Sequence, residues 1–120
     1  MPAKGASVQR RFRLTRSQDF QKVRSSGRSY AHPLLVLVAN ANEGPDVHVG
    51  LSAGRTVGTA VKRNRAKRVL RVAMQGLVTS VRPGWDIVLI ARPGLVSADY
   101  LQVRQALIGL LRRAQLIPSA

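Results

Sequence analysis

Residues 62–71, KRNRAKRVLR, form a basic segment that suits a single helix with two different faces. Six of these ten residues are Lys or Arg and none is acidic. At about 100° per residue along a helix, one narrow stripe is apolar and holds Ala66, Val69, Leu70, Ala73 and Leu77. The roughly opposite side holds Asn64, Lys67, Arg68 and Arg71. The pattern therefore predicts a helix that packs one face on a core and presents cations on the other.

The whole chain is strongly basic. Its 120 residues contain 20 Lys and Arg against 5 Asp and Glu, which gives a net charge of +15. A charge of this size attracts phosphate backbones, whereas solubility is usually reached with mixed signs and a smaller net charge. Hydrophobic residues make up 45% of the chain, enough for one compact domain with its own core. We therefore expect a nucleic acid as the partner, with an anionic membrane surface as the weaker alternative.

Some classes of protein are excluded by what the sequence lacks. It has no cysteine, so disulfides and thiol-ligated metals are excluded. No apolar run approaches the ~20 residues of a membrane span, and residues 1–13 lack the apolar segment of a secretory signal. We expect residues 1–13 to form a flexible basic arm and residues 14–118 to form a single domain. A cytoplasmic location and no contact with a membrane follow as expectations.

The first half of the chain predicts one helix and two strands. A short helix is expected over residues 18–25, with Ser17 as its N-cap. Apolar runs at residues 34–39 and 47–52 have strand length, and a turn sequence separates them. The two runs are expected to pair as an antiparallel hairpin.

The second half of the chain predicts two helices around a third strand. The basic helix is expected from about residue 58 to 81, and the strand spans residues 86–91. A last helix follows an N-cap at Ser97 and carries Tyr100 in its core stripe. The order α-β-β-α-β-α indicates an α+β sandwich, in which helices pack on a small mixed sheet.

Few side chains could perform catalysis. The acids are Asp19, Glu43, Asp46, Asp86 and Asp99, and no close pair among them suggests acid–base catalysis or a two-metal site. His48 lies on the polar side of its strand, where it could stack on a base. Phe20 and Tyr30 each have basic neighbours and could stack on unpaired bases as well. We therefore predict a binding protein without catalytic residues or a metal site of its own.

The basic segment and its flanks resemble a known family. Residues 55–71, RTVGTAVKRNRAKRVLR, are similar to the signature of the bacterial ribonuclease P protein component, an Arg-Asn-Arg core followed by Lys-Arg and then Arg. Residues 14–23, 49–52 and 90–93 are similar to parts of the family's first helix, second strand and third strand. The resemblance covers about residues 12–116. It implies a fold like the second domain of a small-subunit ribosomal protein, with an unusual left-handed βαβ crossover.

This resemblance also implies a function within a ribonucleoprotein enzyme. Members of the family join a catalytic RNA that removes the 5′ leader of precursor tRNA, and the RNA holds the catalytic Mg²⁺ ions. No protein partner is implied. Contacts with the catalytic RNA are expected from Arg55, Lys62, Arg63, Asn64, Arg65, Lys67, Arg68 and Arg71.

The resemblance places the single-stranded leader in a central cleft. By position, the lining residues would be Phe20, Val36, Val38 and Arg92. Three further residues are added for their own chemistry: Arg24, Tyr30 and His48. Arg24 stands where the family often has a second aromatic residue, and a cation can still stack on a base or pair with a phosphate.

Two alternatives stay open on the sequence. A ribosomal protein that binds structured RNA would share the charge, the size and this class of fold. A protein-only nuclease would need metal-dependent chemistry from residues such as Asp86 or His48.

Overall fold

The computed structural model describes residues 17–118, and the basic arm expected over residues 1–13 lies outside this range. Within the described range, the helices and strands follow one another in the order α1 (Ser17–Ser26), β1 (Arg28–Ala31), β2 (Leu35–Ala41), β3 (Val47–Ala53), α2 (Ala60–Gln75), β4 (Trp85–Ala91) and α3 (Tyr100–Arg113). Short 3₁₀ helices lie between them: η2 (Arg55–Val57), η3 (Val78–Ser80) and η4 (Pro93–Ser97).

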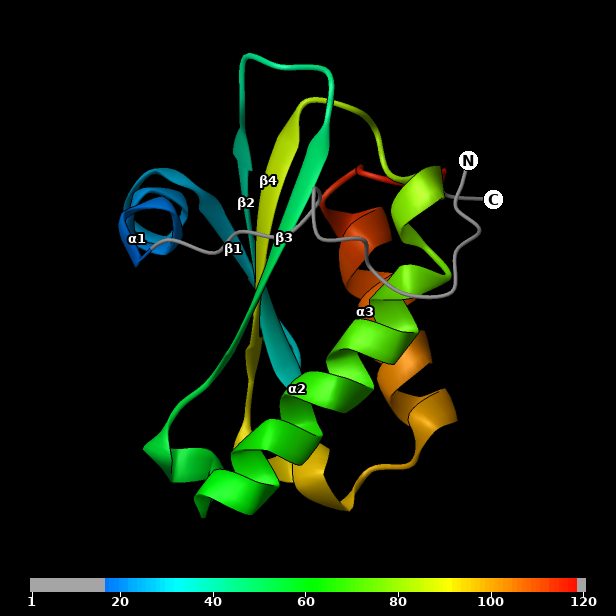
Figure 1. Cartoon of the computed structure of the whole chain (residues 1–120). Helices are drawn as coiled ribbons and strands as arrows, with labels where there is room; N and C mark the ends of the chain where they lie inside the picture. Colours follow the sequence, from blue (N-terminus) through cyan, green and yellow to red (C-terminus); the bar gives the residue numbers. More distant parts are fainter. Residues whose placement is uncertain (1–16, 119–120) are drawn as a thin grey trace.

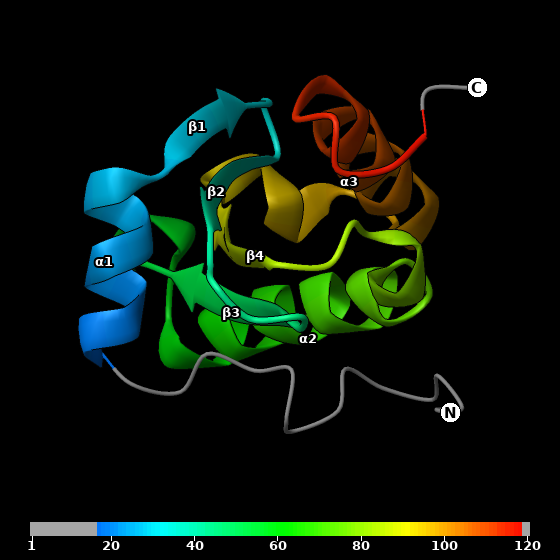
Figure 2. The same cartoon turned by 90° about the horizontal axis from the view of Figure 1, so that it is seen from above.

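The strands form one mixed sheet in the order β1-β2-β4-β3. β4 pairs with β2 in the antiparallel sense and with β3 in the parallel sense. Helix α1 covers one face of this sheet, and α2 and α3 cover the other (Figures 1 and 2). The result is the α+β sandwich predicted from the sequence, with helices on both faces of a small mixed sheet.

The predicted antiparallel hairpin between residues 34–39 and 47–52 is wrong. Both β2 and β3 pair with β4, which lies between them. The reason is the burial of β4, since Ile87 and Leu89 are fully buried on one face and Val88 on the other. A strand that is apolar on both faces is most stable in the interior of the sheet. β3 is polar on one face, at His48 and Ser52, and takes an edge.

Four further details differ from the sequence prediction. β1 was not expected, because it is only four residues long and mostly exposed. α2 runs from Ala60 to Gln75, which is shorter than the expected helix at both ends. The N-cap of α3 is Asp99 rather than Ser97: its carboxylate accepts from the Gln102 backbone N–H at 2.8 Å, and the Gln102 side chain accepts from the Asp99 N–H at 3.0 Å. Tyr100 is 43% exposed and lies outside the core.

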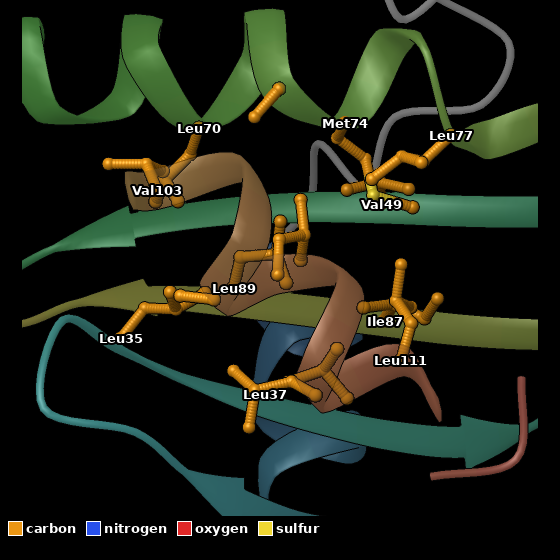
Figure 3. Close-up of a cluster of buried hydrophobic side chains, with 14 of the residues drawn as sticks. Leu35, Leu37, Val49, Leu70, Met74, Leu77, Ile87, Leu89, Val103 and Leu111 are labelled. Atoms are coloured by element: carbon orange, nitrogen blue, oxygen red, sulfur yellow. The ribbon is translucent and has the colours of Figure 1, made fainter. Parts of the chain in front are cut away.

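Two separate cores hold the layers together. The larger core lies between the sheet and helices α2 and α3, and Figure 3 shows its members Leu35, Leu37, Val49, Leu70, Met74, Leu77, Ile87, Leu89, Val103 and Leu111. A smaller core lies under α1 and consists of Val23, Val38 and Val88. Because successive residues of a strand point to opposite faces, the central strands contribute to both cores.

We predict that Leu70→Ala lowers the free energy of unfolding by about 2–5 kcal/mol, because it leaves a cavity between α2 and the sheet. Leu70 is fully buried, whereas Val61 on the same helix is 77% exposed. The matched control Val61→Ala is expected to change stability by no more than about 0.5 kcal/mol. Urea denaturation of both variants measures the difference, and equal losses would contradict the orientation of α2.

Candidate nucleic-acid interface

The outer face of α2 carries the basic segment, as the helical periodicity predicted. Its inner face is buried through Ala66, Leu70, Ala73 and Met74. We call the outer face, together with the exposed Arg55 of η2, the α2 basic surface: Arg55, Lys62, Arg63, Asn64, Arg65, Lys67, Arg68 and Arg71. Four of the seven helical members are exposed, and Arg63, Lys67 and Arg71 are half-buried. All eight predicted RNA-binding residues therefore lie on one continuous stretch of η2 and α2.

The chain reaches α2 through a tight turn at Gly58. This residue has a φ of 137°, a left-handed conformation that favours glycine. A Cβ atom there would lie 2.8 Å from Cδ of Lys62. Thr59 then caps the helix, since its hydroxyl accepts from the Lys62 backbone N–H at 3.3 Å. The turn and the cap together fix where the first cations of α2 emerge from the domain.

In the described part of the chain, most of the charge on this surface has no acidic partner. Within residues 17–118, no carboxylate pairs with the side chains of Lys62, Arg63, Arg65, Lys67 or Arg68. The described acids serve elsewhere: Asp99 caps α3, and Asp86 accepts hydrogen bonds on the other side of the sheet. A row of unpaired cations on a rigid helix suits a polyanion with regularly spaced phosphates.

A second surface lies on the α1 side of the sheet. Phe20 and Val36 are half-buried there, around the small core under α1, and Ile90 lies with them. Arg24 is exposed one helical turn after Phe20. Val38 belongs to the buried core itself, with 3% of its surface exposed, so it supports this surface from below. A half-buried ring beside an exposed cation is the arrangement used to stack unpaired bases.

His48 lies on the same face, at the β3 edge. The parallel register places it beside Asp86 of β4, and its Nδ1 lies 2.9 Å from the Asp86 carboxylate. The Asn42 side-chain amide donates to the same oxygen at 2.8 Å. A carboxylate only accepts hydrogen bonds, so Nδ1 of His48 carries the proton and Nε2 is left for another partner. Sequence reasoning did not connect His48 with Asp86, or Asp86 with Asn42, because these contacts depend on the tertiary structure.

The structure separates one predicted residue from the others. Tyr30 pairs with Leu37, which places it on the face that carries α2 and α3. The opposite face carries Phe20, Val36, Val38 and His48. We define the α1-side surface as the half-buried and exposed residues of that face together with Arg24. Arg92 directly follows β4 and is exposed, and strand alternation puts it on the side of Val88 and Ile90. Tyr30 therefore cannot share a ligand with Phe20 across the sheet.

Metal ligands do not gather in the described part of the chain. Across residues 17–118, no three His, Cys, Asp or Glu side chains come together in a way that could hold an ion. None of the helices in this range is both long and apolar enough to cross a membrane.

Comparison with known proteins identifies the family. The family model for ribonuclease P matches residues 8–115. The ribonuclease P protein component of Herpetosiphon aurantiacus is 42% identical over 109 residues, which cover 91% of this chain and 89% of that protein. The counterpart from Dehalococcoides mccartyi is 37% identical over 108 residues, 90% of this chain and 88% of that protein.

Solved structures agree with this match. The ribonuclease P protein of Staphylococcus aureus superposes with a TM-score of 0.80 at 28% identity, over 89% of this chain and 98% of that one. The protein from Thermotoga maritima gives a TM-score of 0.76 at 30% identity, over 84% of this chain and 96% of that one. The fold, the basic helix and the sequence matches lead to one conclusion: this chain belongs to the family of bacterial ribonuclease P protein components.

Proposed function

We propose that this protein subunit of ribonuclease P binds two RNAs at once. The α2 basic surface would hold the catalytic RNA, and the α1-side surface would hold the single-stranded 5′ leader of precursor tRNA. The observation that carries the proposal is the position of two chemically different surfaces on opposite sides of one sheet. Family membership favours this function over the ribosomal alternative, which the charge and size alone had left open.

The α2 basic surface fits a folded RNA with dense phosphates. Its cations stand on a helix whose backbone is held by the core, so binding has to order only their side chains. Each phosphate neutralised releases counterions, and this release drives association. Asn64, which is exposed among the cations, can donate to and accept from a base edge or the RNA backbone.

The α1-side surface fits an unpaired strand. Phe20 offers a ring for one base, and Arg24 and Arg92 are exposed cations for neighbouring phosphates. Nε2 of His48 supplies a further hydrogen-bonding group at the β3 edge. Contacts of this kind read stacking and backbone charge more than base identity, so leader sequence is expected to matter little.

Cleavage itself would be the task of the RNA. Hydrolysis of the leader calls for Mg²⁺, which activates water and stabilises the leaving oxygen. Membership of the ribonuclease P family favours ions that are held by the RNA. The role of the protein is then to bring the leader and the catalytic RNA together. Its positive charge would also lower the Mg²⁺ concentration that the RNA requires.

The experiment that tests this function compares cleavage of precursor tRNA at low Mg²⁺ by three preparations. These are the catalytic RNA alone, the protein alone, and both together. We expect mature 5′ ends only from the mixture. Metal-dependent cleavage by the purified protein alone would overturn the proposal and support a protein-only nuclease.

We predict that Arg68→Ala weakens binding of the catalytic RNA and lowers the log–log salt slope by about 0.7–0.9, because one phosphate contact is lost. Arg104→Ala is the matched control, since Arg104 lies on α3 outside both surfaces and the charge change is the same. Binding of the catalytic RNA at several salt concentrations measures both slopes, and thermal melting checks that neither variant is unfolded. Identical slopes for the two variants would rule out the α2 contact.

We predict that Phe20→Leu raises KM for precursor tRNA by about fivefold or more, because base–aromatic stacking contributes about 1–3 kcal/mol. Leucine keeps the apolar contact with the core under α1 but removes the ring. Tyr100→Leu is the control, an exposed aromatic residue on α3. The defect is expected to disappear with a precursor whose leader is a single nucleotide. A defect of the same size on that substrate would show that Phe20 acts through the fold.

A further inference from the structure

A hollow of about 390 Å³ lies on the α3 side of the sheet, away from both proposed surfaces. Its chemistry is given by three arginines, two aromatic rings and an amide: Arg28, Tyr30, Arg82, Trp85, Arg113 and Gln115. No acidic residue lines it. Its volume falls in the range of about 300–1,000 Å³ that is typical of ligand sites.

Three distant parts of the sequence build this hollow. β1 contributes Arg28 and Tyr30, which pair with Ala39 and Leu37 and so face α3. The start of β4 contributes Trp85. The chain after α3 turns back at Gln115, whose φ is 60°, and the Leu116 carbonyl accepts from the Arg82 backbone N–H at 2.9 Å. In Figure 2, β1 and the end of α3 lie at the same end of the molecule. The walls are thus fixed by the sheet and by this backbone contact.

The hollow concentrates positive charge. Arg113 is held in place, since its guanidinium donates to the Ala31 carbonyl at 2.8 Å and lies 6.0 Å from the centre of the Tyr30 ring. Within residues 17–118, no carboxylate pairs with Arg28, Arg82 or Arg113. Three like charges around one concave site repel one another and raise the local potential, so an anion bound there would be favoured.

The two rings point to the class of ligand. Tyr30 and Trp85 are both half-buried, so each keeps part of its surface open. A simple anion would use the arginines and make no use of the open part of either ring. A nucleotide uses both, since its phosphate pairs with guanidinium groups and its base stacks on an aromatic face.

A neighbouring hollow of about 410 Å³ extends the site along α3. Arg113 lines both hollows, and the second one adds His32, Gln102 and Gln105. Their imidazole and amide groups can form hydrogen bonds with base edges and sugar hydroxyls. Two adjoining hollows that share one arginine suit consecutive nucleotides of a strand better than a single free nucleotide.

We infer that this hollow is a third RNA-binding site, which takes an unpaired nucleotide of a single strand. Its base lies against Trp85 or Tyr30, and its phosphate lies among Arg28, Arg82 and Arg113. The site is independent of the two surfaces in the proposed function, because it is lined by other residues and needs neither the catalytic RNA nor precursor tRNA to be observed.

Trp85 is the only tryptophan of the chain, so its fluorescence reports directly on this hollow. The test titrates the protein alone with an unstructured single-stranded RNA of about six nucleotides at low salt, within the span that such sites cover. We expect saturable quenching of Trp85 fluorescence. Arg82→Gln is expected to raise the Kd at least about fivefold, whereas Arg104→Gln, with the same loss of charge, changes it less than about twofold.

Three outcomes would overturn the inference. If fluorescence anisotropy detects binding but Trp85 is not quenched, the strand binds elsewhere. Equal effects of Arg82→Gln and Arg104→Gln would show only non-specific attraction. Equal quenching by a polyphosphate of the same charge would exclude base stacking. Arg68→Gln tests whether this site and the α2 basic surface are separate. This variant is expected to weaken binding of the catalytic RNA and to leave the quenching of Trp85 fluorescence by the short RNA unchanged.

Discussion

The burial of β4 on both faces is the constraint on which the rest of the molecule depends. Ile87 and Leu89 join the core with α2 and α3, and Val88 joins the core under α1. A strand with apolar side chains on both sides must lie inside the sheet and be covered twice. This requirement places α1 on one side and α2 with α3 on the other, and α1 and α2 then carry different polar surfaces outward. The separation of the surfaces follows from the packing of a single strand.

Much of this architecture could be predicted from the sequence. The apolar stripe of α2 predicted Ala66 and Leu70 in the core, and the continuous apolar runs predicted β2 and β4. The order of the strands in the sheet could not be predicted from the sequence. Turn residues between the apolar runs at residues 34–39 and 47–52 suggest a hairpin, and they give no information about β4, which follows later in the chain and inserts between β2 and β3. The contrast between the continuous run of β4 and the alternating pattern of β3 was the available signal for interior and edge positions.

The interface could be predicted in part. The charge and periodicity of α2 identified the α2 basic surface directly, since both depend on local sequence. Tyr30 was grouped with Phe20 because β1 was not recognised, and a strand of four residues with one half-buried side chain gives almost no periodic signal. The contact between His48 and Asp86 depends on parallel pairing of strands that are 38 residues apart. Contacts of that range require the tertiary structure.

The central claim is that opposite sides of the sheet bind different RNAs, and the absence of cysteine from the chain allows a direct test. A photo-crosslinker can be attached at Val61→Cys on α2 or at Gln21→Cys on α1, both exposed positions. Each labelled protein is assembled with the catalytic RNA and precursor tRNA, and the crosslinked RNA is identified. We expect the α2 label to react with the catalytic RNA and the α1 label with the 5′ leader. Reaction of both labels with the same RNA would contradict the account.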